Sequence, residues 1–467
     1  MEKSQKILII GAGASGISAA QKLLENNYQH VFILEASNRI GGRIHSIPFG
    51  STGFKIDLGG QWVSGENDIY YMMKDSFKFG DSNLTTDRKY FLSSDNNELD
   101  QKKCRKLYDL LDEIFELEDE LSKSEETFGQ FFSRKYYERI KSSSFKGIDK
   151  ELADKMLHQI NTIWNAYFGS TNLDQVPAKY VSTLELSEGS EFITWRDKGF
   201  ITFLDFLNNK LKKEKYIDIY DKVLFNKKVK NIDWSSNQAT IKCEDGSEFL
   251  VDHVIVTISL GCLKKHHQTM FTPSLPKTKI HAIEDIQYGV AGKVFLEFEE
   301  NFIKKHFPSR INQFAMLWSE AERNELRGTD KKWLLGIYSF MHVDGSDKII
   351  EGFISGADIL EFESKCDEDI IADIMWMLEN FMKKSLERPK NIKRSFWSTD
   401  NNFYGVYSFG SQGNSVYDLA QPLLKENKSP ILLFGGEAAD EHDSGFVHGA
   451  MNSGFRVAQE IIDYYHK

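Results

Sequence analysis

The segment from residue 6 to 43, KILIIGAGASGISAAQKLLENNYQHVFILEASNRIGGR, constrains the fold more than any other part of the chain. A short apolar run leads into a glycine-rich turn, a helix-like stretch follows, and a second apolar run ends at Glu35. This order predicts two parallel strands joined by a helix whose N-terminus faces a pyrophosphate. Gly11 permits the tight turn, Gly13 lets the backbone approach a phosphate, and Gly16 lets the helix pack closely on the strand. Glycine spacing alone is a weak signal, but with these flanking elements it predicts a dinucleotide site.

The residues from Glu35 onward indicate which dinucleotide is bound. Glu35 can accept both hydroxyls of an adenosine ribose. The glycine pair in Arg39-Ile-Gly41-Gly42-Arg43 is costly inside a helix but lets the backbone run against a flat ring or a phosphate, and Arg43 offers a fork to phosphate oxygens. Alone, this run would be a surface turn with two solvated arginines. Directly after a strand–helix–strand unit it resembles the second signature of FAD-binding amine oxidases and their relatives, so FAD is the predicted cofactor.

Length and composition bound the remaining possibilities. At 467 residues, with 41% hydrophobic residues, the chain suits two domains with large cores. A net charge of −11 argues against nucleic-acid binding and is compatible with a cationic substrate steered by an acidic surface. Four dispersed cysteines (Cys104, Cys243, Cys262 and Cys366) show no zinc or disulfide pattern and suit a reducing compartment. We expect no signal peptide, membrane span or peroxisomal tripeptide, which predicts a cytoplasmic protein without a membrane partner.

Hydrophobic periodicity predicts the elements beyond the first unit. Leucine and isoleucine residues at helical spacing between positions 107 and 121 predict one amphipathic helix. The segments 239–243 and 248–256, around an Asp-Gly turn, predict a hairpin. Further predictions are a strand over 292–300, a helix over 368–384, and a strand, a glycine turn and a helix over 431–462.

The chain as a whole resembles flavin-dependent amine oxidases, and polyamine oxidases most closely. The motifs behind this resemblance are GAGASG, EASNRIGGR, DLGGQW, VIVTISLG, a lysine-bearing strand, FWSTDNNFYGVYS and FGGEAADEHDSGFVHGA. The resemblance implies an α/β fold, with a Rossmann-type FAD-binding domain assembled from separated segments and an α+β substrate domain with a mixed or antiparallel sheet. The predicted segments are 1–85, 196–290 and 396–467 for the FAD domain, and 86–195 and 291–395 for the substrate domain.

The positions predicted to contact FAD come from the first unit and from the resemblance. They are Gly11, Gly13, Ala14, Ser15, Gly16, Glu35, Ala36, Arg39, Gly42, Arg43, Gly59, Gly60, Gln61, Trp62, Val229, Thr257, Trp397, Gly436, Glu437, Phe446 and Val447. In the family, Trp397 would pack against the flavin and Val229 would contact the adenine through its backbone. Glu437 follows a buried-looking strand, where a carboxylate is costly without a partner. Val406 stands where monoamine oxidases attach FAD through a cysteine, so we expect non-covalent FAD.

Three residues have catalytic roles in the chemistry that the resemblance implies. Tyr407 and Phe446 match the two aromatic rings that hold the substrate nitrogen. Phe446 departs from the family, where tyrosine is usual, so the ring is kept and the hydroxyl is lost. Lys293 matches the lysine that reaches the flavin N5 through a water and assists proton handling. Without the resemblance, the aromatic residues would be assigned to the core and the lysine would snorkel to solvent.

The predicted substrate contacts are Trp62, Ser64, Tyr407 and Phe446. Ser64 stands where polyamine oxidases have a His or a Glu that helps to place the cationic substrate. A serine cannot carry charge, so we expect a preference for N1-acetylated polyamines unless another acid substitutes. The candidates for such an acid are Asp174, Glu185 and Glu188.

The activity implied is oxidation of an amine by FAD, followed by imine hydrolysis to an aldehyde and a shorter amine, with molecular oxygen reduced to hydrogen peroxide. A spermine oxidase acting on free spermine is the nearest alternative. A histone demethylase would need docking modules and a helical insertion for which 467 residues leave no space. An L-amino-acid oxidase would need an arginine to bind the substrate carboxylate, and no arginine of this sequence can be assigned to that role. A flavin-binding paralogue without activity is the non-enzyme alternative, motivated by Ser64 and Phe446.

Overall fold

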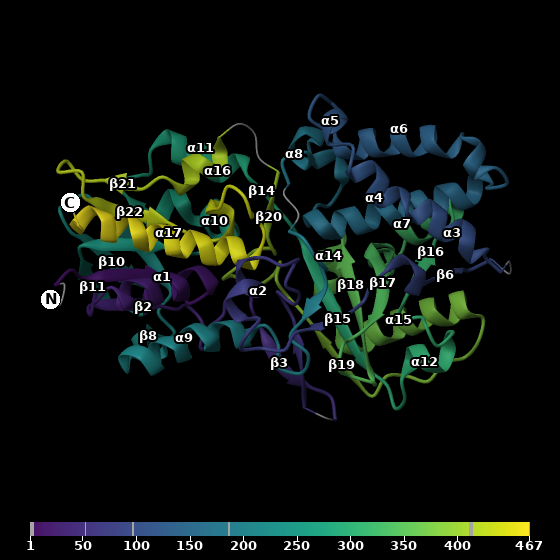
Figure 1. Ribbon diagram of the computed structural model, residues 1–467, viewed down its shortest axis with the longest axis horizontal. Helices are drawn as coiled ribbons and strands as arrows, with labels where there is room; N and C mark the ends of the chain where they lie inside the picture. The colour runs from purple at the N-terminus through teal and green to yellow at the C-terminus, as the bar shows by residue number, and fades with distance from the viewer. Residues whose placement is uncertain (1–3, 52, 96–97, 185–186, 411–413, 467) are drawn as a thin grey trace.

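Two six-stranded sheets organise the protein, and each lies at the centre of one of the two lobes seen in Figure 1. The computed structural model describes residues 4–51, 53–95, 98–184, 187–410 and 414–466. The first strand and the last helix belong to the same lobe, so the chain leaves this lobe and returns to it (Figure 1). None of the helices in the described part combines the length and the apolarity that a bilayer crossing needs.

The first sheet is almost entirely parallel. In spatial order its strands are β21 (Leu423–Leu424), β22 (Pro430–Phe434), β12 (His253–Val256), β1 (Ile7–Ile10), β2 (Val31–Leu34) and β8 (Val223–Leu224). The edge strand β21 is antiparallel to β22, and the other neighbouring strands are parallel. β1 and β22 are buried along their whole length, as expected for strands that are covered on both faces.

Helices cover one face of the first sheet, and a smaller sheet with further helices covers the other. Because side chains alternate along β1, Ile7 and Ile9 enter the first core while Leu8 and Ile10 enter the second. The first core includes α1 (Ala14–Glu25), α9 (Ile201–Lys215) and α17 (Val447–His466). The second includes β9 (Val229–Asp233), β10 (Ala239–Cys243), β11 (Glu248–Val251), α10 (Leu260–Met270), α11 (Lys277–Asp285) and α16 (Ser415–Ala420).

The second sheet is mostly antiparallel. In spatial order its strands are β19 (Asn391–Arg394), β15 (Ala291–Glu297), β18 (Ile349–Ser355), β17 (Ile337–His342), β16 (Gln313–Leu317) and β6 (Lys89–Ser93). β16 and β6 are the parallel pair, with Gln313 opposite Lys89. On one face, Val294 and Leu296 pack with α12 (Phe302–His306) and α15 (Asp367–Met382). The opposite face bears Lys293 and Phe295. Helix α7 (Lys150–Phe168) contacts β16, β17 and β18, and Phe295 packs with Phe49, Phe54 and Leu58.

Most of the predicted elements are confirmed, and two predictions are wrong. The segment between 107 and 121 is not one helix but three, α3 (Gln101–Tyr108), α4 (Leu110–Phe115) and α5 (Glu118–Leu121). The backbone of Leu117, at φ −78° and ψ 50°, is not helical, so the helix ends there. The apolar side chains on both sides of the break still pack into one core. Likewise, 248–256 is not one strand. Its first part pairs with β10 as a hairpin, and β12 turns into the first sheet at Asp252, whose carboxylate accepts the Lys6 N–H at 2.9 Å.

Candidate active site

The carboxyl ends of four parallel strands meet at one edge of the first sheet. Gly11, Glu35, Thr257 and Gly436 follow β1, β2, β12 and β22 at this edge. Ligands of parallel sheets bind at such an edge. All four residues line one cavity of about 1200 Å³, which continues to the face of the second sheet that bears Lys293. The cavity therefore joins the nucleotide end predicted from the sequence to the predicted catalytic lysine.

The glycine-rich turn has the close packing that its spacing predicts. Gly11 has φ +109°, and a Cβ there would lie 2.9 Å from the Thr257 hydroxyl oxygen. A Cβ on Gly16 would lie 2.0 Å from the Gly11 carbonyl oxygen, so α1 can begin this close to β1 only without a side chain at that position. The turn thus leaves the first N–H groups of α1 at the cavity wall.

Glu35 is held at the wall by its own neighbours. One carboxylate oxygen accepts the Ala12 N–H at 2.8 Å and the other accepts the Ser37 N–H at 2.8 Å. Arg39 is not among the cavity-lining residues, and its guanidinium donates to the carbonyls of Ile40 and Ile44 instead. Arg39 therefore stabilises the turn after Glu35.

Glu437 connects three segments that surround the cavity. This buried carboxylate forms an ion pair with Arg43 at 2.8 Å, which is the partner that its burial requires. Its second oxygen accepts the N–H groups of Ser408 at 3.1 Å and Gly445 at 3.0 Å. The neighbours of Tyr407 and Phe446 in the sequence are thus fixed by the same side chain. Arg43 also donates to the Val406 carbonyl at 2.6 Å.

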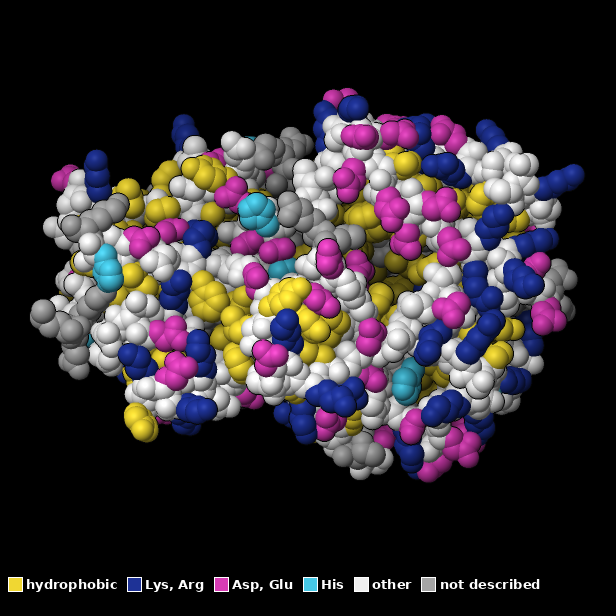
Figure 2. All heavy atoms as spheres, in the orientation of Figure 1, with side chains coloured by type: hydrophobic (Ala, Val, Ile, Leu, Met, Phe, Trp, Pro, Cys, Tyr) yellow, Lys and Arg dark blue, Asp and Glu magenta, His cyan; other side chains and the backbone are white. Residues whose placement is uncertain are grey.

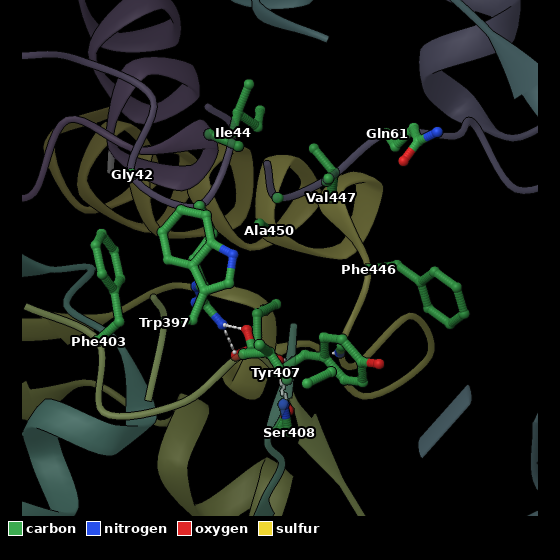
Figure 3. A pocket seen from close by; sticks show the side chains of 18 of the residues that line it. Gly42, Ile44, Gln61, Trp397, Phe403, Tyr407, Ser408, Phe446, Val447 and Ala450 are labelled. Carbon is green, nitrogen blue, oxygen red and sulfur yellow. Dashed lines mark hydrogen bonds and ion pairs between the residues drawn. The ribbon is translucent and has the colours of Figure 1, made fainter. Parts of the chain in front are cut away.

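Aromatic side chains form the wall of the cavity between the two sheets. In Figure 3, Trp397 lies toward Phe403, while the rings of Tyr407 and Phe446 extend on the side of Gln61. The Trp397 indole N–H donates to the Leu58 carbonyl at 2.8 Å, which fixes the plane of the ring. The Tyr407 hydroxyl donates to the Ala166 carbonyl on α7. Rings held in this way can enclose a flat ligand and exclude water.

Lys293 is surrounded by oxygen atoms. Its Nζ donates to the carbonyls of Asp57 at 3.2 Å and Gly59 at 2.9 Å and to the Gln61 side-chain oxygen. Glu351 lies behind it, with Oε1 at 3.4 Å from Nζ and Oε2 accepting from the Gln61 amide at 2.7 Å. The lysine therefore joins β15 to the Asp57–Gln61 loop and keeps a buried carboxylate as its counterion.

The carboxyl group of the neighbouring Asp57 has a raised pKa. Burial raises its pKa to about 6, although hydrogen bonds from Ser46 and the Phe200 N–H and the charge of Lys293 act in the opposite direction. The charge of Glu351 raises this pKa further. Lys293 and Glu351 therefore act on the pKa of the Asp57 carboxyl in opposite directions.

Lys89, which lines the cavity, and Glu351, which lies behind Lys293, are charged residues that the sequence reasoning missed. Each is a charged residue in a strand pattern that is otherwise largely apolar, and this isolation is a signal that could have found them. Glu351 is 0% exposed and Lys89, which lines the cavity, is 2% exposed.

Carboxylates line the cavity on the side of α4. They are Asp81, Asp112, Glu116 and Glu191. Figure 2 shows acidic side chains clustered over α4, beside a hollow between the lobes in which hydrophobic side chains are visible. Burial raises the pKa of the Glu191 carboxyl, and the charge of Asp112 raises it further. A cationic ligand would relieve this repulsion.

Ser64 lines the cavity, but Asp174 and Glu188, two of the three acids considered as its replacements, do not. Asp174 is exposed and accepts a hydrogen bond from the Thr127 hydroxyl at 3.0 Å, and Glu188 is also outside the cavity lining. Glu185 lies outside the described residues. The acids of the cavity come from other segments, chiefly α4 and the chain before β7 (Ile193–Thr194).

The structure brings nearly all predicted site residues to this one cavity. The lining includes Gly11, Gly13, Ala14, Ser15, Glu35, Ala36, Gly42, Arg43, Gly59, Gly60, Gln61, Trp62, Ser64, Val229, Thr257, Lys293, Trp397, Tyr407, Gly436, Glu437, Phe446 and Val447. Gly16 and Arg39 are the predicted residues that do not line it. This lining fits a flavin dinucleotide. It has a glycine-rich turn at a helix N-terminus, an acid at the end of β2, and aromatic side chains at the other end of the cavity.

Comparisons with known proteins agree with this geometry. The family model described as flavin containing amine oxidoreductase matches residues 14–462. The chain is 26% identical to the peroxisomal N(1)-acetyl-spermine/spermidine oxidase of Bos taurus, over 98% of this chain and 95% of that protein. It is 25% identical to probable polyamine oxidase 5 of Arabidopsis thaliana, over 100% of this chain and 99% of that protein. The solved structure of cyclohexylamine oxidase from Brevibacterium oxydans shares the fold, with a TM-score of 0.70 at 17% identity over 100% of both chains.

Proposed function

Since the chain belongs to the family of flavin containing amine oxidoreductases, we propose that it oxidises an N1-acetylated polyamine with bound FAD and molecular oxygen. The products would be an aldehyde, a shorter amine and hydrogen peroxide. The bovine relative bears the name of an oxidase of N(1)-acetylated spermine and spermidine, which supports this substrate class.

One observation supports the acetylated substrate in particular. Ser64 lines the cavity without a charge, while the acidic residues that line it include Asp112 on α4 and Glu191 before β7. An acetyl-capped end does not need a counterion, whereas an unpaired ammonium is costly to desolvate. The remaining ammonium groups of the same molecule can pair with Asp112 and Glu191. A monoacetylated polyamine therefore suits a cavity that has an uncharged side chain at Ser64 and carboxylates at Asp112 and Glu191.

The residues of the chain would position and desolvate the reacting amine. When bound, the flavin supplies the two-electron chemistry, taking electrons from the carbon next to the nitrogen and passing them to oxygen. Tyr407, Phe446 and Trp397 would exclude water and present aromatic faces to the amine. Lys293, with its ammonium held by Glu351 and loop carbonyls, would place a proton donor at the cavity wall.

The FAD is proposed to bind without a covalent bond. Val406 lines the cavity next to Tyr407, and a valine side chain offers no atom for attachment to the flavin. The contacts to the dinucleotide would come from the α1 N-terminus, Glu35 and the segment around Glu437.

A peroxide assay across spermine, spermidine and their N1-acetyl forms tests the function. The proposal expects kcat/KM to favour N1-acetylspermine over spermine, and expects Ser64→Glu to reduce this preference. A wild-type protein that favours free spermine tenfold would contradict the acetylated substrate and leave the amine oxidase intact.

Free spermine is the second candidate substrate. The observation that favours it is the group of carboxylates on the α4 side of the cavity, Asp81, Asp112, Glu116 and Glu191, which could bind an ammonium at each end of a longer chain. The same assay with Glu191→Gln separates the two candidates. If free spermine is the substrate, this substitution should lower kcat/KM for spermine more than for N1-acetylspermine.

The cytosol is the proposed location. All four cysteines are unpaired thiols, and three of them are buried, which suits a reducing compartment. Imaging of the full chain with a fluorescent tag would test this, and a punctate peroxisomal pattern would contradict it.

A further inference from the structure

The described part of the chain contains four buried lysine side chains, Lys89, Lys155, Lys279 and Lys293. Lys155 forms ion pairs with two carboxylates, Lys279 donates to three backbone carbonyls, and Lys293 has the partners given above. Lys89 differs from them. The described residues give its Nζ one hydrogen bond, donated to the Tyr108 hydroxyl at 2.8 Å, and no carboxylate partner.

The open side of Lys89 is the cavity. The side chain is 2% exposed, yet it lines the cavity together with Tyr108 and Tyr338, whose ring centroids lie 4.4 Å and 5.8 Å from Nζ. An ammonium has three N–H donors, so two of them have no partner among the described residues. Loss of hydration lowers the pKa of Lys89 to about 7. An acceptor oxygen that enters the cavity would supply the missing partner.

Lys89 lies at the opposite end of the sheet from Lys293. Strand β6 is four strands from β15, which corresponds to about 19 Å across the sheet. The path between the two lysines runs along aromatic rings. Lys293 Nζ is 5.8 Å from the Phe353 centroid, Phe353 is 5.7 Å from Tyr338, and Tyr338 is next to Lys89. An extended chain that lies over these rings would have one end at each lysine.

We propose that Lys89 selects the substrate by donating a hydrogen bond to the acyl oxygen at the far end of an N-acylated polyamine. The assignment rests on the proposed function and deepens it, because it names the residue that recognises the acyl cap. A free terminal ammonium at this place would meet the like charge of Lys89. A terminal carboxylate would be repelled by the acidic side chains Asp112, Glu116 and Glu191 of the same cavity. A neutral acyl oxygen meets neither obstacle.

The selectivity of Lys89→Met holoenzyme tests the proposal. In the wild type, kcat/KM for N1-acetylspermine should exceed that for spermine, and Lys89→Met should lower this ratio about tenfold, as expected for loss of a hydrogen bond to a charged donor. Lys102→Met is the matched control, since it removes the same charge from an exposed position on α3 and should leave the ratio unchanged. An unchanged ratio in Lys89→Met holoenzyme that still oxidises both amines would overturn the proposal and leave the proposed function standing.

A binding measurement tests the proposal independently of turnover. N,N′-diacetylputrescine has an acyl oxygen at each end and no oxidisable amine. Its affinity for the holoenzyme, measured by calorimetry, should fall about tenfold in Lys89→Met and not in Lys102→Met. Equal affinity in wild type and Lys89→Met would overturn the proposal even if no amine were oxidised. Tighter binding of 4-aminobutanoate than of the diacetyl probe would overturn the assignment to an acyl group.

Discussion

Glu351 Oε1 lies 3.4 Å from Lys293 Nζ, and neither side chain is more than 6% exposed. The two residues come from neighbouring antiparallel strands, β18 and β15. Gln61 bridges them, because its amide oxygen accepts from Lys293 while its amide nitrogen donates to Glu351. Lys293 and Glu351 are therefore joined both by a direct ion pair and through Gln61.

The coupling between these two residues is measurable. Breaking a buried ion pair leaves a charge without a partner, so Glu351→Gln should lower the free energy of unfolding by about 3 kcal/mol. In the double variant Glu351→Gln/Lys293→Met, most of this loss should be recovered, because no ammonium is left unpaired. Chemical denaturation of the four proteins gives the coupling energy. Additive effects of the two substitutions would show that the pair is not coupled.

Lys293→Met should fold and bind flavin but turn over slowly. Loss of a preorganised proton donor at the cavity wall should raise the barrier by on the order of 2–4 kcal/mol. Stopped-flow measurement of flavin reduction and of its reoxidation would locate the slowed step. If both half-reactions ran at the wild-type rate, Lys293 would have a structural role alone.

The purified protein should be yellow and should lose its flavin on acid precipitation. The reason is that Val406, beside Tyr407 at the cavity wall, has no group that can bond to the flavin ring. The absorbance of the supernatant and of the redissolved pellet measures this directly. Flavin that stayed with the denatured pellet would contradict non-covalent binding.

Lys89→Met should stabilise the protein in a pH-dependent way. Loss of hydration lowers the pKa of Lys89 from 10.5 to about 7, so between these pH values the unfolded chain binds more protons than the folded one. The free energy of unfolding of the wild type thus rises with pH over this window. The destabilisation caused by burying the Lys89 ammonium is complete below pH 7. The variant should be more stable by a few kcal/mol at pH 7, and its advantage should vanish near pH 10. Thermal unfolding at both pH values checks this, and a constant difference would contradict it.

The sequence predicted those parts of the site that are encoded locally. The Gly11–Gly16 turn, Glu35 and the glycine pair before Arg43 lie within one short segment, so their order and spacing predict a dinucleotide site whose residues line the cavity, apart from Ala12 and Gly16. Lys89 reaches the cavity, and Glu351 reaches Lys293, only through strand pairing across the second sheet, which no single segment encodes. For the same reason the sequence around Ser64 does not indicate Asp112 or Glu191. These two acids come from separate segments of the fold. The break at Leu117 was missed because the apolar positions around it keep a helical spacing.

Mixing the flavin-loaded protein with N1-acetylspermine in the absence of oxygen tests the central claim most directly. The claim is that this cavity joins a flavin site to an amine site, so the visible flavin absorbance should bleach on mixing. Readmitted oxygen should restore the absorbance and release hydrogen peroxide in proportion to the flavin. A flavin-loaded protein whose absorbance stayed unchanged with N1-acetylspermine, spermine and spermidine would contradict the account.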